Sequence, residues 1–161
     1  MSIRFKKILF LKLSKIFLTF LIIIVFTISE NLKAENITGS KTYDTDTNNT
    51  QYIFTEDNSS AVVTGNTTLE RSRKLFILND SERTGNTLTI HFGSTVSTTT
   101  NSNTIFTDGA ELTIVNSGTI NSDSSKAINV SNSDGVSITN KNTGVIKSNN
   151  NTILGDAGSG A

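Results

Sequence analysis

Residues 112–120 read LTIVNSGTI, which is an alternating apolar segment, a turn of Asn, Ser and Gly, and another apolar residue. Segments with the same pattern occur at 88–96 (LTIHFGSTV) and at 136–146 (VSITNKNTGVI). The repeated apolar positions form three series: Leu88, Leu112 and Val136; Ile90, Ile114 and Ile138; and Val96, Ile120 and Ile146. The first two series advance by 24 residues, and the third by 24 and then 26, which indicates a two-residue insertion at 141–142. The sequence therefore contains an internal repeat of about 24 residues.

Each repeat is expected to form one coil of a solenoid built from short strands. Leu112 and Ile114 point to one face of a strand, because successive side chains alternate between its two faces. A second strand in each repeat is indicated at 104–106, 127–130 and 152–154. We therefore expect an all-β solenoid in which the three apolar series form core columns, with about 4.8 Å between coils. Asn116 and Asn140 are expected to form an amide ladder between two coils.

The composition after residue 34 fits short strands joined by polar turns. Residues 35–161 contain 23 Thr, 18 Asn, 17 Ser and 11 Gly, and the whole chain has no Cys. The apolar residues are clustered rather than scattered, which favours strands and turns over disorder. The absence of Cys means that disulfide bonds do not stabilise the chain.

The first 34 residues are expected to be a cleavable bacterial export signal with a helical apolar segment. They carry six Lys or Arg and one Glu, and an apolar run follows this basic region at 16–28. That run would span roughly 20 Å as a helix, which is short for a hydrocarbon core of about 30 Å. Ala34 and Glu35 are the expected residues on either side of the cleavage site. The alternative is an uncleaved N-terminal anchor, which would place Lys12 and Lys15 in or near the bilayer.

The remaining chain divides into two segments by the regularity of its repeats. We expect residues 35–85 to be an irregular N-terminal cap with one degenerate coil, and residues 86–161 to hold the regular repeats. The repeats are also expected to be truncated, because residues 155–161 add no polar capping element.

The segments NSGTI at 116–120 and ITNKNTGVI at 138–146, together with the long basic signal, resemble the N-terminal passenger region of bacterial autotransporters, the type V secretion proteins. The resemblance implies a right-handed parallel β-helix that is displayed at the cell surface or secreted. It also implies the Sec export machinery, signal peptidase and a C-terminal β-barrel encoded downstream as partners. A chain without such a barrel would stay in the periplasm. The part of the sequence after residue 121 does not resemble a barrel, so we expect it to be a passenger fragment.

Residues with chemical potential are few. His91 is the only histidine, and with no Cys we expect no zinc site and no nucleophile with a neighbouring base. Asp108, Asp134 and Asp156 recur near glycines, which favours turns over a calcium ladder or an acidic catalytic cleft. Residues 71–74 (RSRK) hold the one basic cluster after residue 34, and we interpret it as a solvated turn.

Two functional hypotheses remain. The first is an exported β-helical passenger with a structural or adhesin-like role, no catalytic site and no cofactor, which binds a host or glycan surface. The alternative is an exported β-helical polysaccharide lyase or hydrolase fragment, which requires convergent acidic and basic side chains. Residues 35–161 carry eight Lys or Arg and thirteen Asp or Glu, and this acidic balance argues against a nucleic-acid partner.

Overall fold

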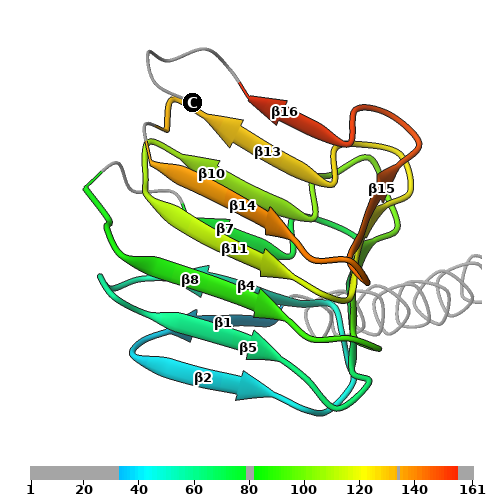
Figure 1. Ribbon diagram of the computed structural model, residues 1–161, viewed down its shortest axis with the longest axis horizontal. Coiled ribbons are helices and arrows are strands. Elements are labelled where there is room, and N and C mark those ends of the chain that lie inside the picture. Colours follow the sequence, from blue (N-terminus) through cyan, green and yellow to red (C-terminus); the bar gives the residue numbers. More distant parts are fainter. Residues whose placement is uncertain (1–32, 79–81, 134, 156–161) are drawn as a thin grey trace, which may run out of the picture. The chain divides into compact units, whose positions relative to one another are not determined.

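The strands of this chain coil into a parallel β-solenoid of about five turns (Figure 1). The computed structural model describes residues 33–78, 82–133 and 135–155. Within these ranges, every element is a strand, and no helix is long and apolar enough to cross a membrane. The expected signal helix and its apolar run lie outside the described residues.

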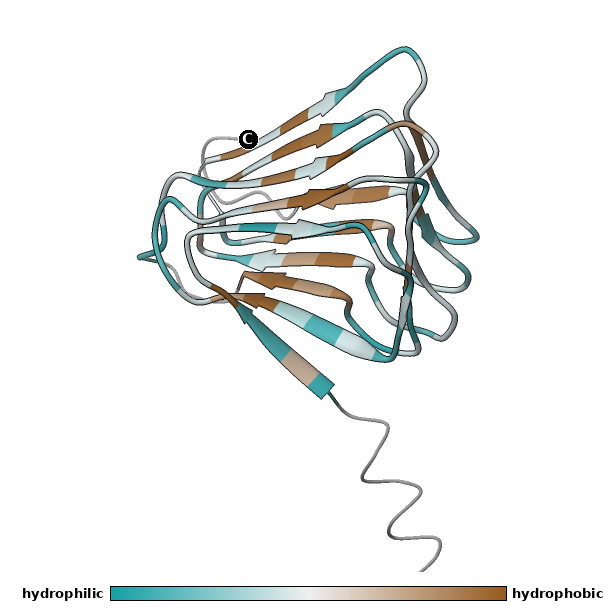
Figure 2. Ribbon diagram, turned by 90° about the horizontal axis from the view of Figure 1, so that it is seen from below, coloured by the Kyte–Doolittle hydropathy of each residue, from teal (hydrophilic) through white to brown (hydrophobic). Residues whose placement is uncertain are grey.

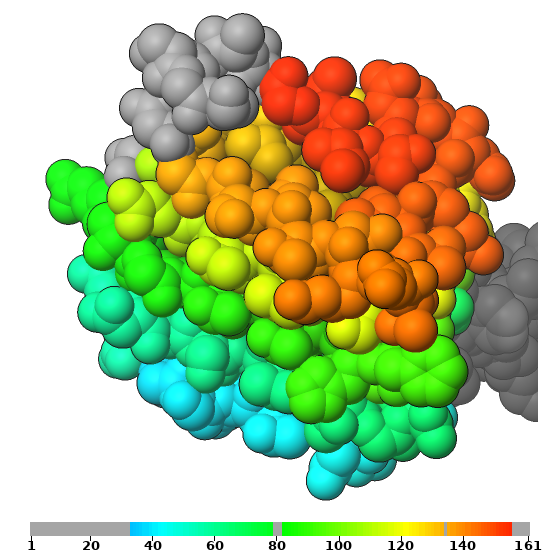
Figure 3. All heavy atoms as spheres, viewed as in Figure 1, coloured from blue at the N-terminus to red at the C-terminus, as the bar shows by residue number. Residues whose placement is uncertain are grey.

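In the described residues, sixteen strands form three parallel sheets, and each complete coil contributes one strand to each sheet. Sheet A contains β1 (Lys33–Ile37), β4 (Thr50–Phe54), β7 (Phe76–Leu78), β10 (Ile105–Asp108), β13 (Ile128–Ser131) and β16 (Ile153–Gly155). Sheet B contains β2 (Ser40–Tyr43), β5 (Ser60–Val63), β8 (Asn86–Ile90), β11 (Leu112–Asn116) and β14 (Val136–Asn140). Sheet C contains β3 (Thr47–Asn48), β6 (Thr68–Arg71), β9 (Thr95–Thr98), β12 (Thr119–Ser122) and β15 (Val145–Ser148). Figure 3 shows the successive coils as bands of colour that run from blue to red.

The core lies between the three sheets and is built from the alternate side chains of each strand. In β11, Leu112 and Ile114 are buried while Thr113 is exposed, which is the alternation that a strand imposes. The apolar stretches lie on the strands and the polar stretches in the connecting turns (Figure 2). Because a single coil cannot enclose its own apolar face, each coil depends on its neighbours for burial.

The register between coils differs in one place from the spacing of the repeat. Between β11 and β14, Leu112 lies beside Val136 and Ile114 beside Ile138, 24 residues apart. Between β8 and β11, however, Leu112 lies beside Asn86 and Ile114 beside Leu88, which is a step of 26 residues. The expected pairs of Leu88 with Leu112 and of Ile90 with Ile114 are therefore wrong.

Turn length explains the altered register. The turn from β8 to β9 has four residues, 91–94, whereas the turn from β11 to β12 has two, 117–118. The earlier coil thus carries the same two-residue insertion that the sequence indicated at 141–142. Beyond these turns, Ile120 lies beside both Val96 and Ile146, so the third apolar series does form one column.

The nine residues of the three series all point into the solenoid, but they are not equally enclosed. The six that precede residue 121 are fully or almost fully buried: Leu88, Ile90, Val96, Leu112, Ile114 and Ile120. Val136, Ile138 and Ile146 pack against this core and are partly buried. They lie on the coil of β13, β14 and β15, beyond which only β16 follows in the described part of the chain.

The described residues of 35–85, for which the sequence predicts an irregular N-terminal cap with one degenerate coil, form coils with an uneven step between paired residues, 17 from Lys33 to Thr50 and 27 from Ser60 to Thr87. This segment contributes strands to all three sheets, in register with the later coils. Its interior is filled by aromatic rings: Tyr52 stacks on Phe76 with ring centroids 5.1 Å apart, and Tyr43 packs against Tyr52 at 4.5 Å. The rings pack in the same core as buried aliphatic side chains such as Val63, Leu69 and Leu75.

Candidate functional site

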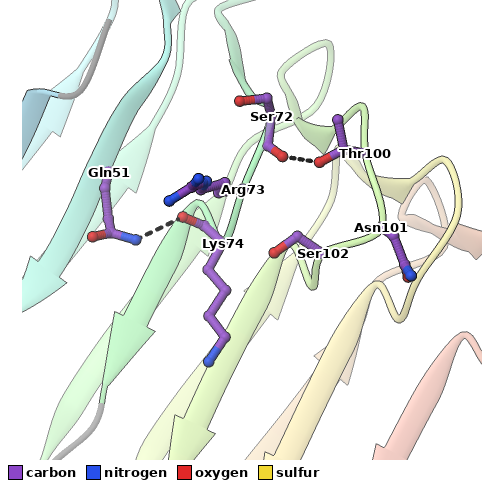
Figure 4. Close-up of a pocket in the computed structure, with 7 residues that line it drawn as sticks. All are labelled: Gln51, Ser72, Arg73, Lys74, Thr100, Asn101 and Ser102. Atoms are coloured by element: carbon purple, nitrogen blue, oxygen red, sulfur yellow. Dashed lines mark hydrogen bonds between the residues drawn. The ribbon is translucent and has the colours of Figure 1, made fainter. Parts of the chain in front are cut away.

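A cleft of about 570 Å³ lies at the corner where the chain passes from sheet C to sheet A. We call it the corner cleft. Its lining comes from β4, from the turn after β6 and from the turn after β9: Gln51, Ser72, Arg73, Lys74, Thr100, Asn101 and Ser102. Figure 4 shows these side chains along three successive coils at this corner.

Hydrogen bonds between coils fix the shape of the corner cleft. The Gln51 side-chain amide donates a 3.0 Å hydrogen bond to the Lys74 carbonyl, and the Thr100 hydroxyl donates to the Ser72 carbonyl (Figure 4). The Arg71 guanidinium also donates to the Lys74 carbonyl, over 2.8 Å. The backbone that carries Arg73 and Lys74 is thus held from below, from above and from within its own coil.

Arg71 belongs to a column of polar side chains that point inward where the strands of sheet C end. Thr98, Ser122 and Ser148 follow it in register on the next three coils. Thr98 donates a 2.9 Å hydrogen bond to the Ser102 carbonyl, and the Ser122 hydroxyl accepts one of 3.1 Å from the Ser125 amide. Each side chain therefore satisfies a backbone group in the loop that follows its own strand, which buried polar groups require.

Lys74 extends from the corner cleft along the outer face of sheet A. Its ammonium nitrogen lies 3.3 Å from the centroid of the Phe106 ring, a cation–π contact. Burial lowers the pKa of Lys74, while the charge of Asp108 raises it. Burial also lowers the pKa of Arg71, and the neighbouring Arg73 lowers it further.

The corner cleft is cationic without a matching acid. Among the described residues, no carboxylate lines it, and neither Arg73 nor Lys74 forms an ion pair. The lining offers cations, amides and hydroxyls, which are groups that bind and orient a polar ligand. It lacks the pair of carboxylates with which most glycoside hydrolases cleave their substrate.

The structure separates the other candidate residues. His91 is exposed in the turn after β8, where its Nδ1 lies 3.1 Å from the Thr64 hydroxyl. Asp108 lies beside Ser131 in register and accepts a 3.0 Å hydrogen bond from the Asn132 amide. Asp134 and Asp156 lie outside the described residues, so the proposed aspartate column is not tested. Within the described ranges, no three His, Cys, Asp or Glu side chains cluster closely enough to hold a metal ion.

The outer face of sheet B is a second repetitive surface. Ten outward positions form two columns, one of Ser40, Ser60, Thr87, Thr113 and Ser137, and one of Thr42, Val62, Thr89, Val115 and Thr139. Eight of these ten side chains carry a hydroxyl group and none is charged. The face therefore offers hydrogen-bonding groups at regular intervals and no titratable group for catalysis.

Glu35 and Ala34, the residues of the expected cleavage site, lie in β1. Ala34 is beside Gln51 and Glu35 beside Tyr52, and the Tyr43 hydroxyl donates a 3.3 Å hydrogen bond to Glu35. Cleavage between them would leave Glu35–Ile37 paired with Tyr52–Phe54 in sheet A.

The sequence pointed to the basic cluster at 71–74 but not to the cleft that it lines. Gln51 is 23 positions from Lys74 and Thr100 is 28 from Ser72, and nothing in the local pattern of Gln51 or Thr100–Ser102 marks them. The signal that could have found them is stacking in register, because each lies one coil from the cluster. Comparisons of the chain with protein-family models, with curated proteins and with solved structures found no match.

Proposed function

We propose that this chain is an exported, non-catalytic β-solenoid with an adhesin-like role, which uses its corner cleft to bind a polar ligand such as a surface glycan. The observation that carries the proposal is the make-up of the cleft, whose lining within the described part of the chain holds cations, amides and hydroxyls but no carboxylate. Such a site can bind a ligand, and its described lining has no carboxylic acid to protonate a leaving group.

The same proposal includes export, which rests on the first 34 residues. The basic region and short apolar run would bring the chain to the Sec machinery, and signal peptidase would cut between Ala34 and Glu35. The pairing of Glu35–Ile37 with β4 is compatible with this cut, because the new N-terminus would still begin within a strand. The likeness of the repeats to autotransporter passengers supports display at the cell surface or release from it.

A combined assay of binding and turnover tests the binding role. The full chain is incubated with a panel of neutral and acidic glycans, and bound glycan is measured in parallel with new reducing ends and unsaturated products. We expect saturable binding and no release of product. Turnover of any glycan would replace the proposal with the exported lyase or hydrolase.

Export has its own test. The full chain is produced in a bacterium with two membranes, the cells are fractionated, and the N-terminus of the product is sequenced. We expect the product outside the cytoplasm with Glu35 as its first residue. A product that remains in the cytoplasm would contradict export, and one that leaves it but still begins at Met1 would contradict only the cleavage.

A further inference from the structure

We propose that the corner cleft binds a polysaccharide that carries carboxylate or sulfate groups. The inference rests on the proposed function, because it takes the cleft to be a binding site and assigns the chemistry of its ligand. Three features support it: unpaired cations, neutral donors that suit sugar hydroxyls, and an apolar strip beside them.

The cations of the cleft indicate that its ligand is negatively charged. Arg73 is exposed at the cleft and Lys74 is half-buried, and neither is paired with a carboxylate within the described residues. Arg71, the third cation of the cluster, is buried and bonded to the Lys74 carbonyl, so it is committed to the fold. Two cations therefore remain for a ligand, and a guanidinium is suited to two-point contact with a carboxylate or sulfate.

The neutral lining indicates a sugar rather than a simple ion. The other five side chains of the cleft are amides and hydroxyls, which can donate to and accept from the hydroxyl groups of a sugar. They come from three coils, so the donors are spread along the solenoid rather than gathered at one point (Figure 4). An extended chain of sugars would contact them in succession.

An apolar strip continues from the cleft along the outer face of sheet A. Ile53 lies beside Ile77 and Ile77 beside Phe106, all half-buried on the outward side, with the Lys74 ammonium over the Phe106 ring. The C–H face of a sugar ring can pack on such a strip while its acidic group meets Lys74. This combination of an apolar strip and a cation at its edge fits an acidic sugar better than a neutral one.

Other polyanions fit less well. The described lining of the cleft holds no aromatic side chain on which unpaired bases could stack, which sites for single-stranded nucleic acid use. The lining of the cleft contains no apolar side chain, so it offers no pocket for the apolar side chains of a peptide.

The test compares defined polymers and matched variants of the full chain. Binding of polygalacturonate, dextran sulfate, neutral dextran and polyglutamate is measured at one ionic strength, because salt screens exposed charges. The test variant is Arg73→Gln with Lys74→Gln. The control, Lys141→Gln with Lys147→Gln, removes the same charge from two exposed lysines away from the cleft. If the double variant fails to fold, Arg73→Gln alone is used as the test variant.

We expect the chain to bind polygalacturonate or dextran sulfate, with the test variant weaker by about tenfold for each cation removed and the control unchanged. Asp108→Asn should bind more tightly, because it removes the negative charge that acts on Lys74. Equal weakening of the test and control variants, or polyglutamate binding as tight as that of the acidic glycans, would overturn the inference. Binding of neutral dextran alone would overturn it and leave the proposed function standing, whereas failure to bind any glycan would overturn both.

Discussion

The Asn116 side-chain amide donates a 2.8 Å hydrogen bond to the Asn140 side-chain oxygen on the next coil. This confirms the amide ladder expected from the repeat. The same Asn116 amide also lies 3.2 Å from the Val145 carbonyl, and its oxygen accepts from the Gly118 amide. One buried side chain thus joins two coils and closes the turn between β11 and β12.

Replacing Asn116 should therefore be costly. Asn116→Ala leaves the Gly118 amide and the Asn140 oxygen without this partner, and we expect the free energy of unfolding to fall by about 2–4 kcal/mol. Chemical denaturation measures the change. Asn129→Ala is the control, because Asn129 points outward from β13 and should change stability by less than about 0.5 kcal/mol. Equal effects at the two positions would contradict a structural role for the ladder.

Gly118 should not tolerate a side chain. A Cβ at this position would overlap the backbone oxygens of His91 and Ser94, which cannot move without shifting the turn on the coil below. Gly118→Ala should lower the free energy of unfolding by at least about 2 kcal/mol, by the overpacking of a filled site. In Gly155→Ala the new methyl group meets no atom within 4 Å, so thermal unfolding of that variant should match the wild type. A stable Gly118→Ala variant would show that the coils sit further apart than described.

Two buried hydroxyls should respond in opposite ways to removal. The Ser94 hydroxyl is buried without a hydrogen-bond partner, so Ser94→Ala should be neutral or stabilise the fold by up to about 1 kcal/mol. The Thr98 hydroxyl lies 2.9 Å from both the Ser102 carbonyl and the Thr104 hydroxyl, so Thr98→Val should cost about 1–3 kcal/mol. Denaturation midpoints of the two variants test the pair. A loss of stability in Ser94→Ala as large as in Thr98→Val would be inconsistent with the hydrogen bonds assigned here.

Alkaline pH should weaken the first coils. Burial raises the pKa of Tyr43, and the facing Glu35 carboxylate raises it further. Because the folded pKa lies above the unfolded value of about 10, the stabilisation is complete below that pH and is lost as the pH rises above it. We expect the free energy of unfolding to fall by no more than about 1.4 kcal/mol per pH unit from this phenol.

Tyr43→Phe is the control for that pH dependence. It retains the ring that packs against Tyr52 but removes the ionisable hydroxyl, so its stability should decline less steeply above pH 10. Parallel slopes for the variant and the wild type would mean that Tyr43 does not carry the effect.

The sequence predicted the solenoid because its apolar residues alternate and recur, which is sufficient to define strands and their stacking. It did not predict the register of β8 on β11, since aligning Leu88 with Leu112 satisfied the apolar pattern equally well. In the structure, Asn86 takes the buried position beside Leu112, and its side-chain oxygen accepts a 3.0 Å hydrogen bond from the Ser59 amide. A buried polar residue whose hydrogen bonds are satisfied inside the core does not contribute to the apolar pattern of the sequence, so that pattern could not reveal it.

The corner cleft was harder to predict than the core. Its residues come from loops whose spacing along the chain depends on the lengths of all the turns between them. An error of two residues in one turn, such as that at 91–94, misaligns the strand before the turn with its neighbour, as it does for β8 and β11. Local composition marked the cations at 71–74, but only the stacked coils place Gln51 and Thr100 beside them.

The inward polar column of Arg71, Thr98, Ser122 and Ser148 also bears on how this surface can change over evolution. The loops that follow these residues contain four, six, five and four residues, yet the strands on either side remain paired. Ser122 and Ser148 each bond to the loop of their own coil and also to a carbonyl in the loop below, that of Ser102 and that of Ser125. A change in one loop must therefore keep these contacts between coils, so selection can vary the outer side chains of this edge more freely than the path of its backbone.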